Sequence, residues 1–134
     1  PDNWAAANGM AALVEGLAGV KNEGLAFNKV TISPRWSSAA VDSVNVTINL
    51  AASNGYVAYQ YKNNIASKLI DLYVTGSGNQ LKGHVLLPQN ASSVSAVTAG
   101  NKSLQYKIST IENSKYVDFE LPLPSVQRVA IRYQ

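Results

Sequence analysis

The amino-acid sequence predicts a mainly β protein, an antiparallel β-sandwich of eight or nine strands preceded by one N-terminal α-helix. Three observations lead to this fold class. Residues 3–18 carry the broad apolar surface of a helix, and from Phe27 onward the hydrophobic period changes from about 3.6 residues to 2. The later segments are short and separated by turn-forming residues, so two sheets are needed to cover their apolar faces. A closed barrel is the alternative architecture.

The length and composition are those of one folded domain. The chain has 134 residues, of which 46% are hydrophobic and 14% charged, with seven tyrosines. We divide it at residue 26, into a terminal helix with its linker (1–26) and a C-terminal β-sandwich domain (27–134).

The predicted helix is apolar nearly all round, with Asn8 and Glu15 as its main polar interruptions. Asp2 or Asn3 can cap its start, and Gly19 can end it. Such a pattern is typical of a helix buried on several sides, which one small sheet cannot provide. We therefore expect the helix to pack against neighbours that this chain does not contain. Within the chain it can dock through Leu13, Val14 and Leu17, which leaves an alanine-rich side for self-association.

The strands follow in order after the helix. Residues 29–32 alternate before Pro34, and the clearest half-buried strand places Val44, Val46, Ile48 and Leu50 toward the core. Asn54-Gly55 predicts a hairpin turn and Asn63-Asn64 a second turn. Pro122 and Pro124 fit a crossing loop or a sheet edge. The remaining strands are expected at 56–62, 68–75, 80–87, 93–98, 104–111, 116–121 and 126–133.

Composition excludes several classes of function. The chain has no cysteine and one histidine, His84, so we expect no thiol chemistry, no metal site and no cofactor. The net charge of +3 comes from basic residues spread without a run, which argues against a nucleic-acid partner. No apolar stretch approaches the roughly 20 residues that cross a bilayer, so no membrane partner is expected.

No catalytic residue is predicted. Asp118 and Glu120 have the spacing of a carboxylate pair, but both fall on the solvated side of a strand whose other face is apolar. Glu15 on the helix is expected to bind backbone or an arginine. His84 is expected to be a surface histidine, with no acid or hydroxyl nearby in the sequence.

Aromatic residues supply the candidate binding site. Trp36, Tyr59 and Tyr61 are the residues that could stack on a carbohydrate, and alternation places Tyr59 and Tyr61 on one face with Tyr56 on the other. The competing interpretation is that these rings pack in the core or at its rim.

Four segments resemble a known family. The run 8–20 (NGMAALVEGLAGV), followed by 29–36 (KVTISPRW), is similar to the tail of the bacterial six-hairpin glycosidases, and 83–88 and 116–119 look like the β-sandwich of that tail. The resemblance implies a chain that joins the last helix of an (α/α)6 barrel to a C-terminal β-sandwich. It also accounts for the over-apolar helix, which in such a parent packs inside the barrel.

The resemblance implies a non-catalytic role for this chain. The domain would support the catalytic barrel of a glycoside hydrolase and help to shape the rim of its active site, in the periplasm or outside the cell. No catalytic residue can be carried over, because the barrel that holds the general acid and base is not part of these 134 residues. Two other functions stay open: a free-standing carbohydrate-binding module, and a surface adhesion or assembly domain that exchanges strands through an open edge.

Overall fold

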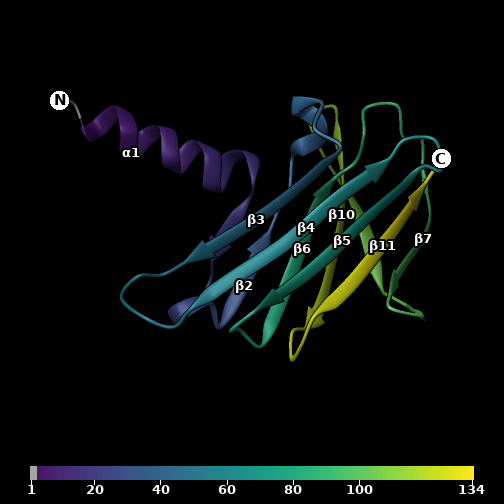
Figure 1. Cartoon of the computed structure of the whole chain (residues 1–134). Coiled ribbons are helices and arrows are strands. Elements are labelled where there is room, and N and C mark those ends of the chain that lie inside the picture. Colours follow the sequence, from purple (N-terminus) through teal and green to yellow (C-terminus); the bar gives the residue numbers. More distant parts are fainter. Residues whose placement is uncertain (1–2) are drawn as a thin grey trace.

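The computed structural model describes residues 3–134 and confirms the predicted fold class, two β-sheets preceded by one N-terminal helix (Figure 1). The five-stranded sheet has the order β1 (Val20–Asn22), β2 (Lys29–Ile32), β6 (Gln80–Leu86), β10 (Ser114–Pro122), β9 (Tyr106–Ile111). The six-stranded sheet has the order β3 (Ser43–Asn49), β4 (Tyr56–Asn64), β5 (Leu69–Gly76), β11 (Gln127–Tyr133), β7 (Val94–Ala99), β8 (Lys102–Ser103). Neighbouring strands are antiparallel except β2 and β6, which are parallel. The short strands β1 and β8 were not predicted.

The core lies between the two sheets, as alternation requires. Val44, Val46, Ile48 and Leu50 are partly buried and pack against it, which confirms the predicted register of β3. The side chains with no exposed surface come from both layers: Ile32, Tyr61, Ile70, Leu72, Val74, Leu81, Val85, Val117, Val129 and Ile131.

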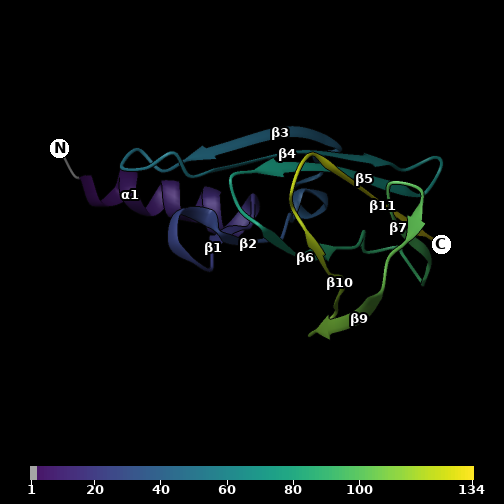
Figure 2. The same ribbon diagram turned by 90° about the horizontal axis from the view of Figure 1, so that it is seen from below.

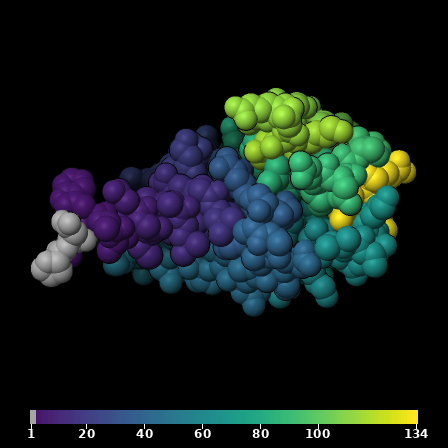
Figure 3. Space-filling model, turned by 90° about the horizontal axis from the view of Figure 1, so that it is seen from above, coloured from purple at the N-terminus to yellow at the C-terminus, as the bar shows by residue number. Residues whose placement is uncertain are grey.

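The helix differs from its prediction in form and in burial. It is α-helical over α1 (Asn3–Ala11) and continues as the π-helix η1 (Ala12–Leu17), where the Ala18 amide donates to the Leu13 carbonyl at 2.9 Å. No residue of α1 is buried, and the helix projects from one end of the sandwich (Figures 1 and 3). Val14 and Leu17 do pack against the core, whereas Leu13 is half exposed. Gly19, at φ +67°, ends the helix as predicted, and the proposed cap Asp2 lies outside the described residues.

The predicted boundary at residue 26 does not separate two structural units. β1, which precedes it, pairs with β2 in the five-stranded sheet, and Ala18 and Val20 belong to the core. Two 3-10 turns, η2 (Leu25–Phe27) and η3 (Trp36–Ala39), follow in the same packed region. The sandwich therefore begins at the end of the helix.

One of the two predicted turns is present in a longer form, and the other lies elsewhere. The Asn54-Gly55 hairpin is present, but the Leu50 amide bonds to the Gly55 carbonyl across a loop longer than a two-residue turn. β4 continues through Asn63 and Asn64, because Asn63 is buried and its Oδ1 accepts a hydrogen bond from the Tyr133 hydroxyl at 3.0 Å. The reversal follows at 65–68, where Lys68 has φ +51°. The segment with Pro122 and Pro124 crosses between the sheets, as expected.

Candidate functional site

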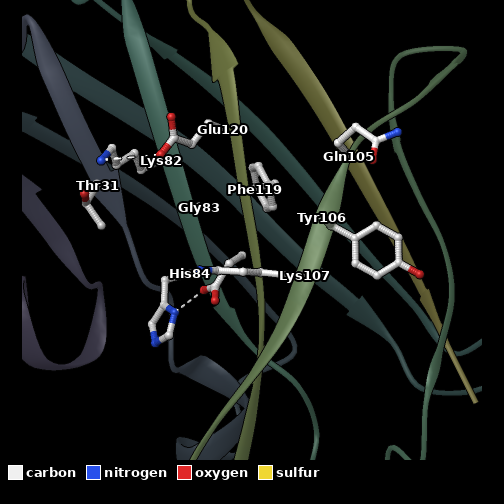
Figure 4. Close-up of a pocket in the computed structure, with 10 residues that line it drawn as sticks. Thr31, Lys82, Gly83, His84, Gln105, Tyr106, Lys107, Phe119 and Glu120 are labelled. Carbon is white, nitrogen blue, oxygen red and sulfur yellow. Dashed lines mark hydrogen bonds and ion pairs between the residues drawn. The ribbon is translucent and has the colours of Figure 1, made fainter.

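A groove of about 530 Å³ lies on the outer face of the five-stranded sheet, the face turned away from the core (Figure 4). Alternation along β6 and β10 places Lys82, His84, Asp118 and Glu120 on this face, because Leu81, Val85, Val117 and Leu121 point into the core. The lining is completed by parts of Thr31 in β2 and of three consecutive residues at the start of β9: Gln105, Tyr106 and Lys107.

His84 and Asp118 form an ion pair or hydrogen bond at the centre of the groove. The two residues are directly opposite in the β6–β10 register, and Nδ1 of His84 contacts Oδ1 of Asp118. The imidazole also stacks on Tyr116, with ring centroids 4.0 Å apart and planes 9° apart. His84 faces outward from the sheet, as predicted. The sequence shows no acid near His84, because Asp118 is 34 residues away along the chain and becomes its neighbour only in the sheet.

The other charges of the groove are arranged in the same cross-strand fashion. Lys82 Nζ lies 3.4 Å from Glu120 Oε1, and Gln80 Nε2 donates to Glu120 Oε2 at 3.2 Å. Lys107 is opposite Asp118 in the β9–β10 register and extends toward His84 in Figure 4. Apart from His84, the charged groups of the groove are two ammonium groups and two carboxylates, whose formal charges cancel.

Gly83 and Phe119 fix the spacing of the two strands beneath the groove. They are cross-strand partners, and a Cβ built on Gly83 would lie 2.2 Å from the Phe119 ring. The phenyl ring thus covers the glycine on the core side. A larger residue at position 83 would have to displace the Phe119 ring.

The aromatic residues predicted to bind carbohydrate lie elsewhere. Trp36, Tyr59 and Tyr61 are all buried between the sheets, which leaves no exposed ring face for a sugar. The Tyr59 hydroxyl accepts a hydrogen bond from Trp36 Nε1 at 2.8 Å and donates to the Ala18 carbonyl at 2.7 Å. The Trp36 indole and the Tyr59 hydroxyl are hydrogen-bonded inside the protein, and all three rings pack in the core, which agrees with the competing interpretation. Trp36 lies near the end of the helix, because the Tyr59 hydroxyl connects it to Ala18.

Burial also changes the proton affinity of the two tyrosines. Loss of hydration, and the proximity of Tyr133, raise the pKa of Tyr61 to about 12. The pKa of Tyr59 is also raised well above its usual value by burial. Both hydroxyls therefore stay protonated at neutral pH and act as hydrogen-bonding groups at most.

Across residues 3–134, no group of three or more His, Cys, Asp or Glu side chains is arranged to hold a metal ion. The Thr31 hydroxyl donates to Glu23 at 3.2 Å, and Glu15 is exposed on the helix, away from the groove. In the described part of the chain, no helix is long and apolar enough to cross a membrane.

The polar face of the five-stranded sheet could be predicted from alternation, but its pairing could not. Outward positions in β6 and β10 were visible in the sequence, whereas the partner of His84 depends on the register between two strands that are distant in the chain.

Comparison of the chain with protein-family models, with curated proteins and with solved structures gave no match.

Proposed function

We propose that this chain is a non-catalytic β-sandwich domain that supports the helical catalytic domain of a glycoside hydrolase, with residues 3–17 packed into that partner. The observation that carries the proposal is the helix, which is apolar and lies almost wholly outside the sandwich (Figures 1 and 2). The resemblance of residues 8–20 and 29–36 to the tail of six-hairpin glycosidases supplies the class of partner.

The exposed side chains of the helix favour a partner along its length. Trp4 is 79% exposed, Met10 63% and Leu13 50%, and the positions between them are largely alanine or glycine. Burial of one large apolar side chain is worth about 1.5–3 kcal/mol, so covering these three would stabilise a complex substantially. Small residues between them let another helix approach closely.

The last turn of the helix is attached to the sandwich by hydrogen bonds from three residues. The Arg35 amide donates to the Leu17 carbonyl at 3.0 Å, and Arg35 Nη1 reaches the Gly16 carbonyl at 3.4 Å. The Tyr59 hydroxyl donates to the Ala18 carbonyl, and the Ser33 amide donates to the Gly19 carbonyl at 2.8 Å. These bonds satisfy carbonyls that a helix end leaves without partners, and the cationic Arg35 favours the negative end of the helix dipole. These bonds fix the orientation of the helix relative to the sandwich, which a supporting domain requires.

The groove is consistent with a non-catalytic role for this chain. Asp118 and Glu120 are each engaged by a basic side chain on the neighbouring strand, as expected for a solvated sheet face. Of the alternatives, a carbohydrate-binding module built on Trp36, Tyr59 and Tyr61 loses its support, because those rings are buried.

Two experiments test the proposal together. In the first, the coding sequence that flanks these 134 residues should encode a helical region. In the second, Met10→Asp is introduced into a protein that contains both parts, and this variant should lose stability and glycosidase activity. Ile65→Asp is the matched control, since Ile65 is 58% exposed on a turn of the sandwich. The proposal fails if no helical region is encoded there, or if Met10→Asp behaves like Ile65→Asp in the longer protein.

A further inference from the structure

We infer that the groove on the outer face of the five-stranded sheet binds a neutral, polyhydroxylated ligand, such as a short neutral glycan. This site involves residues on β6, β9 and β10, which are distinct from the buried aromatic residues and from the projecting helix. The inference is independent of the supporting role, because it concerns a surface that is present in this chain by itself.

Charge balance selects the class of ligand. Lys82 and Lys107 offset Asp118 and Glu120, so neither an anion nor a cation gains a net electrostatic attraction in the groove. Each ammonium group also lies next to a carboxylate. An anion bound at the ammonium group would be repelled by that carboxylate, and a cation bound at the carboxylate would be repelled by the ammonium group. A neutral ligand avoids this penalty and still meets strong hydrogen-bonding groups.

The hydrogen-bonding capacity of the groove matches hydroxyl groups, which both donate and accept. An ammonium group has three donors and a carboxylate about four acceptor positions, so the Lys82–Glu120 pair, at 3.4 Å, leaves capacity on both partners. The Asp118 carboxylate can only accept, so Nδ1 of His84 donates in the contact between the two side chains. Donors and acceptors thus lie side by side in both cross-strand rows, Lys82 with Glu120 and His84 with Asp118.

The central pair is held more firmly than an ordinary surface pair. The His84 and Asp118 side chains are only 26% and 19% exposed, and the imidazole is fixed in orientation by its stack on Tyr116. Pre-orientation reduces the entropy lost when a ligand binds. The mobile ends of Lys82 and Glu120, which are about half exposed, can then adjust to the ligand.

The dimensions of the groove fit a short ligand bound weakly. The groove has a volume of about 530 Å³ and is open to solvent, so a bound ligand would keep much of its surface in water. The exposed ring of Tyr106 points away from Lys82 and His84 (Figure 4), so no aromatic face is added to the polar contacts. Because the ligand would make few fully desolvated contacts, we expect dissociation constants of about 1 mM.

The test is a titration of the whole chain, followed by amide chemical shifts. The neutral probes are cellotriose, maltotriose and mannotriose, and the charged probes are the trimers of galacturonate and of glucosamine. At least one neutral trisaccharide should shift amides of β6, β9 and β10 while those of β3 stay in place. The affinity of the protein for this trisaccharide should be nearly the same at low and high salt, because the ligand carries no charge that salt could screen.

Two variants locate the ligand. Lys107→Ala and Glu120→Ala should each weaken the neutral trisaccharide by about tenfold, since each removes hydrogen bonds from a charged group. Lys62→Ala is the matched control, because Lys62 is exposed on β4 in the opposite sheet and should leave binding unchanged. All three positions are exposed, so the variants should fold.

Three results would overturn the inference. The first is that no neutral trisaccharide shifts these amides at about 10 mM, ten times the expected dissociation constant. The second is that a charged trimer binds the groove more tightly than every neutral one. The third is that Lys107→Ala and Glu120→Ala bind as well as Lys62→Ala, which would place the ligand elsewhere.

Discussion

The Tyr59 hydroxyl accepts a hydrogen bond from Nε1 of Trp36 at 2.8 Å, in the buried region where the helix meets the sandwich. The same hydroxyl donates to the carbonyl of Ala18, the residue that follows η1. One phenol therefore joins the indole, the strand β4 and the end of the helix. The neighbouring phenol of Tyr61 differs, because its hydroxyl makes no hydrogen bond of normal geometry among residues 3–134.

Removing the two hydroxyls should have different effects. Tyr59→Phe leaves the Trp36 indole N–H and the Ala18 carbonyl buried without this partner, which should lower the free energy of unfolding by about 1–3 kcal/mol. Tyr61→Phe removes a buried hydroxyl that lacks such a bond, so the variant should be as stable as the parent or more stable. Urea unfolding of the two variants measures the difference, and equal losses would show that the Tyr59 bonds contribute little.

Trp36 should be among the most important core residues. It is buried at the junction of the helix and both sheets, so Trp36→Ala should lower the free energy of unfolding by about 3–5 kcal/mol. Trp4, 79% exposed on the helix, provides the control, and Trp4→Ala should have almost no effect on the isolated chain. Similar losses for the two variants would place Trp4 in a packed environment.

The sandwich should lose stability in alkali because of its buried tyrosines. Tyr61 gives up its proton at the usual pKa of 10.0 in the unfolded chain and at about 12 in the folded protein. Between these pH values the unfolded state binds fewer protons, so the free energy of unfolding falls as the pH rises, while below pH 10 the contribution is complete. Urea unfolding at about pH 9 and about pH 11 should show a smaller decline for Tyr61→Phe than for the parent. An unchanged decline would assign the effect to other groups, such as Tyr59 and Tyr133, whose pKa values burial also raises.

In the absence of its partner, the helix should associate with a second copy at high concentration. The exposed Met10 and Leu13, together with the alanines between and around them, form the contact surface. Sedimentation velocity should show a dimer that disappears on dilution and is abolished by Met10→Asp. Ile65→Asp should retain it, and a strict monomer at high concentration would contradict this expectation.

The fold was largely predictable because its information is local. Val44, Val46, Ile48 and Leu50 alternate with polar residues, and such a period of two defines both a strand and its buried face. Asn63-Asn64 misled the prediction because a buried asparagine bonded to Tyr133 looks like a turn residue in the sequence. The contact depends on a residue 70 positions away.

The candidate site was less predictable for the same reason. Trp36, Tyr59 and Tyr61 have residue types suited to stacking on sugars, but all three are buried, and the polar groups of Trp36 and Tyr59 are hydrogen-bonded inside the core. His84 and Asp118 were both placed outward by alternation, yet their contact depends on the register of β6 with β10. Sequence patterns give the face of a strand, whereas the neighbours on that face follow from the topology of the sheet.

The central claim is that the sandwich holds residues 3–17 only at their C-terminal end, so that the rest of the helix needs a partner. Amide hydrogen exchange on the dilute, monomeric chain tests this claim most directly, because an isolated helix of this length is marginal in water. We predict that amides of residues 4–11 exchange nearly as fast as unfolded peptide, whereas those of β5 and β11 exchange only on global unfolding. Protection of residues 4–11 equal to that of β5 in the monomer would contradict the claim.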